Sequence, residues 1–288
     1  RIFNPEAGAY PIGQLRAESD YLFYPGMFII NDGIVSASNV KSHATISFGG
    51  QSIYDNISSD QVAIESDSSI FLFNDSANLS SLKKGVGIYE VSYVTSSDSV
   101  ELYDIDNKAK NTFSITNNIF CKGRWNPATN LPMITNYYTP SPWPGSYELL
   151  SLFRLPYSTS PTAIGYSIDS LVFGAATLAP NLAGLTMEGY IYKWNDLNGD
   201  LQATNDEMEI AAAGSYTFPS NYTSAFGDIR MNLENFVGDQ PHYCVTGSND
   251  LYIASIKFTG AETVFFGFDE GFDYNGTVAY RSFTNTED

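Results

Sequence analysis

The clearest chemical pattern in the chain is the stretch YKWNDLNGDLQATNDEMEI, residues 192–210. Groups with oxygen ligands recur at alternate positions and then once more after a gap, at Asp196, Asn198, Asp200, Gln202 and Glu207. Counted from Asp196, these are positions 1, 3, 5, 7 and 12, with the backbone carbonyl of Gln202 at position 7. This is the spacing of a calcium-binding loop, in which alternate groups turn inward and a distal carboxylate completes the oxygen shell. The stretch therefore predicts a calcium site.

Two features distinguish this stretch from a helix-loop-helix calcium motif. Leu201 stands where a glycine is expected, with Gly199 two positions earlier, and the preceding GYIYKW (residues 189–194) has the pattern of a strand. The stretch is therefore a loop between strands, with Asp206 or Glu209 as substitute ligands. Two interpretations remain open: a loop that binds a cation, and a solvated hairpin loop in which Asn-Gly makes the turn.

Motifs for other chemistry do not occur in the sequence. It contains no Gly-x-Ser-x-Gly, His-Glu-x-x-His, phosphate-binding loop or dinucleotide fingerprint. Of the two histidines, His43 falls on the polar face of an expected strand and His242 at a strand entry. We assign no catalytic residue. A pair of carboxylates for glycoside hydrolysis stays compatible with 32 acidic residues, although so many acids bring such a pair together by chance.

The acidic balance limits the partners of the chain. The formal net charge is -18, and such a field repels phosphate backbones and anionic lipid headgroups. No apolar run has the length of a membrane-spanning helix, so we expect neither nucleic-acid binding nor direct membrane insertion. The first residues lack the pattern of a signal peptide. We therefore expect that such a segment was removed, or that the chain is a piece of a longer protein.

The elements that must position the loop are strands. HATISF (residues 43–48) and GIYEVSYV (residues 87–94) alternate in polarity, whereas SIFLF (residues 69–73) and TVFFGF (residues 263–268) are nearly continuous apolar runs, as expected for strands buried between sheets. The best helical stretch, residues 207–213, is too short for an independently stable helix. Many short strands with frequent turn signals predict an all-β protein built from β-sandwiches.

The organisation of the chain predicts two β-sandwich domains. SVELYDIDNKAKNTFSITNN (residues 99–118) has the pattern of a hairpin that completes a sheet, and a Pro-rich passage follows at residues 139–144. We expect an N-terminal extension over residues 1–14 and an immunoglobulin-like sandwich over residues 15–118. A larger, jelly-roll-like sandwich is expected over residues 119–288.

Single residues add three expectations. Trp143 lies between prolines, where an exposed ring could stack on a sugar or a protein partner, or could instead anchor the loop at the sandwich edge. Trp194 leads directly into the acidic loop, and we expect it to hold the base of that loop. Cys121 and Cys244 could form one disulfide or be two small buried residues.

The first sandwich also resembles a known family. KKGVGIYEVSYVTSSDSVELYDIDNKAKNTFSI is similar to the closing hairpin of CARDB-like modules, the immunoglobulin-like cell-adhesion-related bacterial domains. The residues that carry the likeness are Gly87, Tyr89, Val91, Asp98, Asp106, Asn107 and Phe113. FRLPYSTSPTAIGYSIDSLVF and GYIYKWNDLNGD resemble the jelly-roll modules that follow such domains in secreted or surface proteins of the Bacteroidota. The resemblance implies export by a type IX secretion system and contact with its proteins, although no sorting domain is recognisable after SFTNTED.

These observations predict a non-catalytic secreted or cell-surface protein. Its sandwich modules would bind a protein or glycan partner, with calcium stiffening the loop at residues 196–207. Two alternatives stay open: accessory or catalytic modules of an exported hydrolase (a glycoside hydrolase or a peptidase), and a structural subunit of an extracellular assembly that is joined through edge strands.

Overall fold

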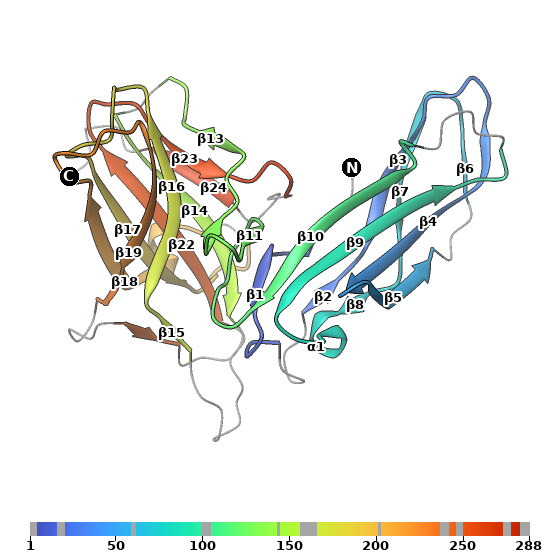
Figure 1. Ribbon diagram of the computed structural model, residues 1–288, viewed down its shortest axis with the longest axis horizontal. Helices are drawn as coiled ribbons and strands as arrows, with labels where there is room; N and C mark the ends of the chain where they lie inside the picture. Colours follow the sequence, from blue (N-terminus) through green and yellow to red (C-terminus); the bar gives the residue numbers. More distant parts are fainter. Residues whose placement is uncertain are drawn as a thin grey trace. The chain divides into compact units, whose positions relative to one another are not determined.

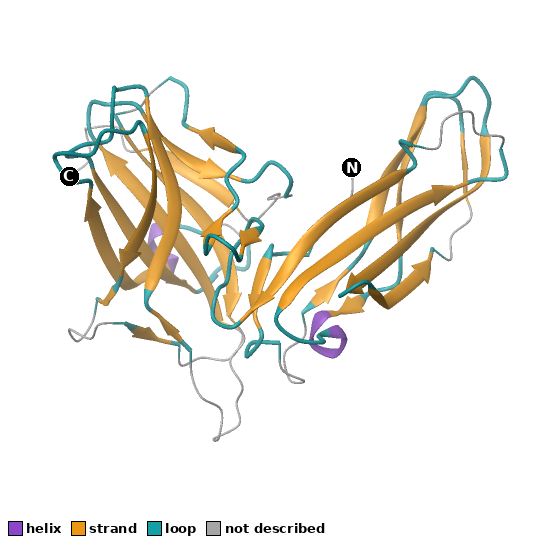
Figure 2. Ribbon diagram, viewed as in Figure 1, coloured by secondary structure: helices purple, strands orange, loops and turns teal. Residues whose placement is uncertain are grey.

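A computed structural model describes residues 5–15, 21–58, 62–99, 105–142, 145–155, 166–200, 203–236, 242–245, 250–272 and 278–282. Strands dominate this described part (Figure 2). The chain divides into two compact units: unit 1 is Arg1–Trp125 with Gly271–Asp273, and unit 2 is Asn126–Glu270 with Tyr274–Asp288. The prediction of an all-β protein with two β-sandwiches is confirmed.

Unit 1 is built from two layers of strands (Figure 1). Its elements are β1 (Ala9–Pro11), β2 (Leu22–Phe23), β3 (Gly26–Asn31), β4 (Ala37–Phe48), β5 (Gln51–Ile57), β6 (Val62–Ile64), β7 (Ser68–Phe73), β8 (Ala77–Asn78), α1 (Leu79–Leu82), β9 (Gly87–Ser96) and β10 (Lys108–Thr116). The larger layer has the order β1-β10-β9-β4-β5, with β6 also paired to β4. The smaller layer is a ribbon in which β2 pairs with β8 and β3 pairs with β7.

The core of unit 1 lies between these layers. Alternation in β4 and β9 buries Ala44 and Ile46 from one strand and Tyr89 and Val91 from the other, as their sequence pattern predicts. The smaller layer contributes residues such as Met27 to the same core. Each layer thus covers the apolar face of the other, which is the basis of a β-sandwich.

The structure corrects the expectation for residues 69–73. Leu72 is buried in β7, but Phe71 and Phe73 are exposed. The reason is that β7 pairs only with β3 in a two-stranded sheet, and the core packs against one face of that sheet. An apolar run is compatible with burial on both faces, yet only one face of this strand is covered.

Unit 2 packs two larger sheets against each other. Its elements are β12 (Leu131–Pro132), β13 (Asn136–Tyr138), β14 (Ser146–Leu155), β15 (Ser167–Ile168), β16 (Ser170–Thr177), β17 (Thr186–Trp194), the 3₁₀ turn η1 (Asn205–Glu207), β18 (Met208–Thr217), β19 (Phe226–Asn232), β20 (Glu234–Asn235), β21 (Tyr243–Cys244), β22 (Asp250–Thr259), β23 (Val264–Phe268) and β24 (Val278–Ser282). One sheet has the order β13-β23-β16-β19 and the other β20-β18-β17-β22-β14-β24. β11 (Trp125–Asn126) pairs with β12 at the division between the units.

The core of unit 2 fills the space between its two sheets. Phe173 and Phe266 from the four-stranded sheet meet Tyr147, Met187 and Phe258 from the six-stranded sheet. A second apolar cluster around Trp194, Tyr192 and Ile253 covers the opposite face of the six-stranded sheet. Strands β17 and β18, which carry the acidic loop, are therefore held by packing on both faces.

The boundaries differ from those expected. The division falls at Trp125 rather than near residue 118. Ala9 to Pro11 pair in parallel with β10, so this part of residues 1–14 belongs to the sheet of the first sandwich rather than to an extension.

Cys121 of unit 1 and Cys244 of unit 2, both within the described chain, do not form a disulfide.

Candidate functional site

The acidic loop connects two long strands of unit 2. β17 and β18 are antiparallel, and their last register pair before the loop is Trp194 with Met208. The backbone N–H of Asn195 donates to the carbonyl of Glu207 at 3.0 Å, which closes the base of the loop. Residues 207–213, the best helical stretch of the sequence, form the end of the turn η1 and the start of β18, because pairing with β17 determines their conformation. Residues 195–207 thus start and end at fixed positions.

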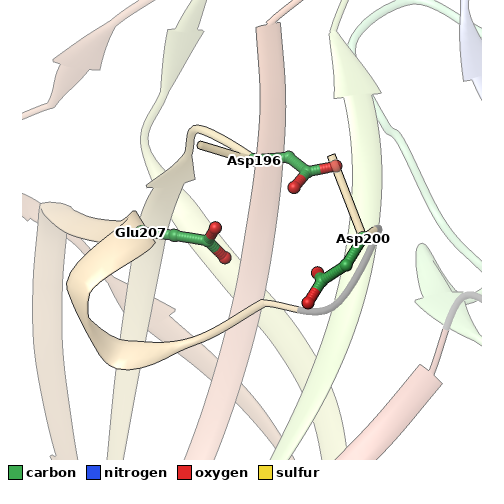
Figure 3. A group of neighbouring side chains, drawn as sticks. All are labelled: Asp196, Asp200 and Glu207. Carbon is green, nitrogen blue, oxygen red and sulfur yellow. The ribbon is translucent and has the colours of Figure 1, made fainter. Parts of the chain in front are cut away.

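Three carboxylates of this loop converge. Asp196, Asp200 and Glu207 each offer a carboxylate oxygen, and these oxygens all lie within 4.8 Å of one another. Figure 3 shows the three carboxyl groups pointing into the same space, with Asp196 and Asp200 on one arm of the loop and Glu207 at the end of η1, directly before β18. The five residues expected as ligands therefore include three that the fold brings together.

Glu207 is the buried member of the group. Its side chain is 4% exposed. Its Oε1 accepts the backbone N–H of Leu197 at 3.0 Å, and its Oε2 accepts that of Thr204 at 3.2 Å. The indole N–H of Trp194 makes a longer contact of 3.5 Å with Oε2. Trp194 is itself buried at the base of the loop, as expected.

These hydrogen bonds keep Glu207 ionised. Burial raises the pKa of the carboxyl group, but the backbone and hydroxyl groups of Thr204, the N–H of Leu197 and the indole of Trp194 outweigh it. The pKa of Glu207 therefore lies below its ordinary value. The result is a negative charge fixed at the inner wall of the loop at neutral pH.

A tight turn shapes the opposite wall. The backbone N–H of Gly199 donates to Oδ1 of Asp196 at 2.8 Å, and the N–H of Asp200 donates to Oδ1 of Asn198 at 2.9 Å. Gly199 has a φ of 74°, a left-handed conformation that glycine adopts without strain. This turn explains why the glycine stands two positions earlier than in the helix-loop-helix motif.

The donor set fits a hard divalent cation. Calcium binds carboxylate and carbonyl oxygens at distances that put opposite ligands about 5 Å apart, close to the largest separation in this group. Residues 195–207 contain four acids and no lysine or arginine. Repulsion among Asp196, Asp200 and Glu207 favours a bound cation or protonation, and the low pKa of Glu207 argues against protonation there.

Two of the residues expected at binding sites fall outside the described chain. Gln202 and Trp143 are in segments that the structure does not describe. Asn198 is described, and its amide donates to Oδ2 of Asp200 at 3.1 Å. The side chain of Asn198 therefore contacts Asp200 twice, through Oδ1 to the backbone N–H and through Nδ2 to the carboxylate, and both contacts support the turn.

A buried carboxylate elsewhere in unit 2 was not anticipated from the sequence. Glu148 of β14 is 1% exposed, and its Oε1 accepts hydrogen bonds from the hydroxyl of Tyr192 at 3.0 Å and from the hydroxyl of Ser255. It joins β14, β17 and β22 on the face of the six-stranded sheet that carries the second apolar cluster. The available signal was a lone acid within the apolar strand SYELLSLF, which indicates a buried carboxyl group with hydrogen-bond partners.

Comparisons with known proteins leave the family open. No family model matches the chain, and no curated protein matches it. A partial N-terminal region of an enterococcal surface protein is among the solved structures that align with it, at 9% sequence identity and a TM-score of 0.24. That alignment covers 96% of this chain and 92% of the other; a likeness of this degree carries no argument about function. No helix among the described residues is long and apolar enough to cross a membrane.

Proposed function

We propose that the chain is a non-catalytic secreted or cell-surface protein whose β-sandwich modules bind a protein or glycan partner, and that residues 195–207 bind calcium. The observation that carries this proposal is the convergence of Asp196, Asp200 and Glu207 on a loop fixed between two packed strands. A cation there would stiffen a loop at one end of the second sandwich, where loops commonly make contacts with partners.

Two features support an extracellular setting. The net charge of -18 favours solubility and supplies carboxylates for divalent cations. A loop with three converging carboxylates suits extracellular calcium, which is bound by modules with dissociation constants of about 0.1 to 1 mM. Export by a type IX secretion system, with the contacts to its proteins that this requires, is proposed on the resemblance of the hairpin at residues 83–115 and of the stretch that includes residues 189–200.

The calcium part is tested by thermal unfolding of the whole chain in calcium and in chelator. A bound ion stabilises only the folded state, and at a concentration of 100 times the dissociation constant it adds about 2.7 kcal/mol. For a unit of this size, the midpoint of the unit 2 transition should rise by roughly 5–10 °C. The midpoint of unit 1 should not change.

Matched variants locate the ion. Asp200→Asn removes one of the three converging carboxylates and should abolish the calcium response. Glu209→Gln removes the same charge as Asp200→Asn, but from β18 and outside the group of three carboxylates. This variant should respond to calcium as the wild type does. A unit 2 midpoint that does not change in calcium raised to about 10–100 mM, which is 100 times the expected dissociation constant, would rule out the site. An equal response of both variants would also rule it out.

A further inference from the structure

The four-stranded sheet of unit 2 has an outer face on the side opposite the core. Ala175 of β16 and Phe266 of β23 form a register pair, and both are buried in the core between the two sheets. Side chains alternate along a strand, so the residues next to this pair are on the outer side. Along β19 the same alternation leaves Phe226, Asp228 and Arg230 exposed. An aromatic ring and two charged groups of opposite sign therefore lie on this face.

Two glycines occupy the middle of the outer face. Gly174 of β16 lies opposite Asp228 of β19, and Gly267 of β23 lies opposite Tyr137 of β13. The side chain of Ile134 rests on both glycines: a Cβ on Gly174 would lie 2.2 Å from its Cδ1, and a Cβ on Gly267 would lie 2.8 Å from its Cγ2. The lack of side chains at these two positions leaves room for groups that lie against the sheet.

Tyr137 extends across these glycines toward Phe226. The two residues belong to β13 and β19, which are the edge strands of the sheet, with β23 and β16 between them. Neighbouring strands are about 4.8 Å apart, so the backbones of the two edges are separated by roughly 14 Å. The ring centroids of Tyr137 and Phe226 are nevertheless 5.5 Å apart, with an interplanar angle of 58°. The rings therefore extend over the inner strands and form one bent surface, which we call the aromatic platform.

Polar groups border the aromatic platform. Among the described residues, the carboxylate of Asp228 and the guanidinium of Arg230 make no hydrogen bond or ion pair. Burial, the carboxylate of Asp228 and the hydroxyl of Tyr222 all raise the pKa of Tyr137. Tyr137 therefore keeps its proton. The border of the platform thus offers an acceptor carboxylate together with donors from a phenol and a guanidinium.

This combination of groups fits a sugar better than a cation. A pyranose has apolar C–H faces that stack on aromatic rings, and hydroxyl groups at its rim that need both acceptors and donors. A cage for an ammonium group needs rings on different sides of the cation, whereas Tyr137 and Phe226 are in contact with each other. Arg230 would also repel such a cation. A pyranose with only equatorial substituents presents its apolar faces unobstructed, and the net charge of -18 disfavours acidic sugars.

We propose that the aromatic platform and its bordering polar groups bind a neutral glycan chain of β-linked pyranose units with equatorial substituents. One unit stacks on the platform, and its hydroxyl groups bond to Asp228, Arg230 and the hydroxyl of Tyr137. This inference rests on the proposed role as a binding protein; it selects a glycan as the partner and places its site on the four-stranded sheet. The acidic loop joins β17 and β18 of the other sheet, so the two sites share no residue.

The test is isothermal titration calorimetry of the full chain with cellohexaose and xylohexaose, two neutral oligosaccharides of this class. A site this small should bind them with a dissociation constant of roughly 0.1–1 mM. The constant should be the same in calcium and in chelator. A hexamer of galacturonic acid, whose units are acidic and carry axial substituents, should not bind.

Variants with matched controls locate the sugar. Phe226→Ala removes a ring that is 58% exposed and should raise the dissociation constant at least about tenfold. Phe236→Ala removes a ring that is 62% exposed beside β18 of the other sheet, and it should bind as the wild type does. Asp228→Ala removes the acceptor and should raise the constant about tenfold. Its control, Glu209→Gln, removes a charge from the other sheet and should have no effect.

The thermal midpoint of unit 2 shows whether each variant is folded. Phe226 and Asp228 are exposed, so their replacement should leave that midpoint nearly unchanged. The proposal is overturned if neither oligosaccharide binds at up to about 10 mM, ten times the weakest expected constant, or if Phe226→Ala and Phe236→Ala weaken binding equally. Binding of tetramethylammonium without binding of sugar would assign the rings to a cation and would also overturn it. None of these results alters the calcium response of unit 2, so the glycan site and the calcium site can fail separately.

Discussion

Asn74 holds the two layers of unit 1 together, and removing its amide group is expected to destabilise that unit. Asn74 follows β7 and is 5% exposed. Its Nδ2 donates to the carbonyl oxygens of Ser42 and Asn56, both at 2.9 Å, and its Oδ1 accepts the hydroxyl of Ser42 at 2.9 Å. These partners lie on β4 and β5 of the larger layer.

The magnitude follows from the three shortest of the four side-chain hydrogen bonds that Asn74→Ala removes; the fourth, from Nδ2 to Oδ1 of Asn56, is 3.3 Å long. Each contributes about 1 kcal/mol net, and the hydroxyl of Ser42, which is fully buried, loses its acceptor. We therefore expect the free energy of unfolding of unit 1 to fall by about 3 kcal/mol. For a unit of this size, its thermal midpoint should decrease by roughly 10–15 °C.

Calorimetry of the full chain is the assay, because each compact unit has a core of its own and is expected to unfold in its own transition. The control Asn118→Ala, at an exposed turn of the same unit, should change the stability by less than about 0.5 kcal/mol. Asn74→Asp should be worse than alanine at neutral pH, because a carboxylate would face two carbonyl oxygens, and should recover at acid pH as it gains a proton. A loss below about 0.5 kcal/mol for Asn74→Ala would refute the reasoning.

Three further predictions concern charge and packing. Burial lowers the pKa of Lys122 to about 8, so its charged form destabilises unit 1 below that pH. The free energy of unfolding of unit 1 should therefore rise by about 2 kcal/mol between about pH 7 and about pH 9.5, because the unfolded chain keeps the lysine proton over this range. Lys122→Met should remove this gain in urea titrations, which stop at about pH 9.5 because most tyrosines of the unfolded chain are protonated up to that pH. Because the pKa of Glu207 is lowered in the folded protein, its ionised form stabilises unit 2 at pH values above the ordinary glutamate pKa of about 4.3. This stabilisation is lost as the pH falls through the folded-state pKa. In Glu207→Gln the free energy of unfolding of unit 2 should therefore fall less steeply with decreasing pH in the acid range. A Cβ on Gly214 would overlap the backbone oxygen of Asn232; Gly214→Ala should therefore cost unit 2 about 2 kcal/mol, whereas Ser215→Ala at the exposed neighbouring position should not.

The parts of the fold that the sequence predicts are those in which one face of a strand is covered. In β4 and β9 the alternation of polar and apolar residues gave the buried face correctly, including Ala44, Ile46 and Tyr89. In β7 the apolar residues fall on both faces, and the sequence does not show whether a second sheet or solvent lies beyond Phe71 and Phe73. Whether Phe71 and Phe73 are buried depends on how many strands pair in the smaller layer, and this number is set by the tertiary structure rather than by the residues of β7 alone.

The loop shows a similar limit. The sequence spacing of the oxygen-bearing residues was enough to predict that Asp196, Asp200 and Glu207 lie in one cluster, because a short loop between paired strands keeps them close. The hydrogen bonds of Glu207 to the N–H groups of Leu197 and Thr204 depend on the path of the backbone between them. That path turns at Gly199, whose left-handed conformation is visible only in the fold.

Glu207 therefore has two roles that experiment can separate. As an anchor it accepts backbone N–H groups from both arms of the loop, and this role requires no ion. As a ligand it would act together with Asp196 and Asp200. In chelator, Glu207→Gln should lower the unit 2 midpoint, because an amide offers one acceptor where the carboxylate offers two. Asp200→Asn should not lower it, because this change relieves repulsion among the three carboxylates and keeps a side-chain oxygen for the amide of Asn198. In calcium, both variants should fail to gain stability. This pattern would mean that hydrogen bonds fix the inner wall before an ion arrives, so that binding has little ordering cost to overcome.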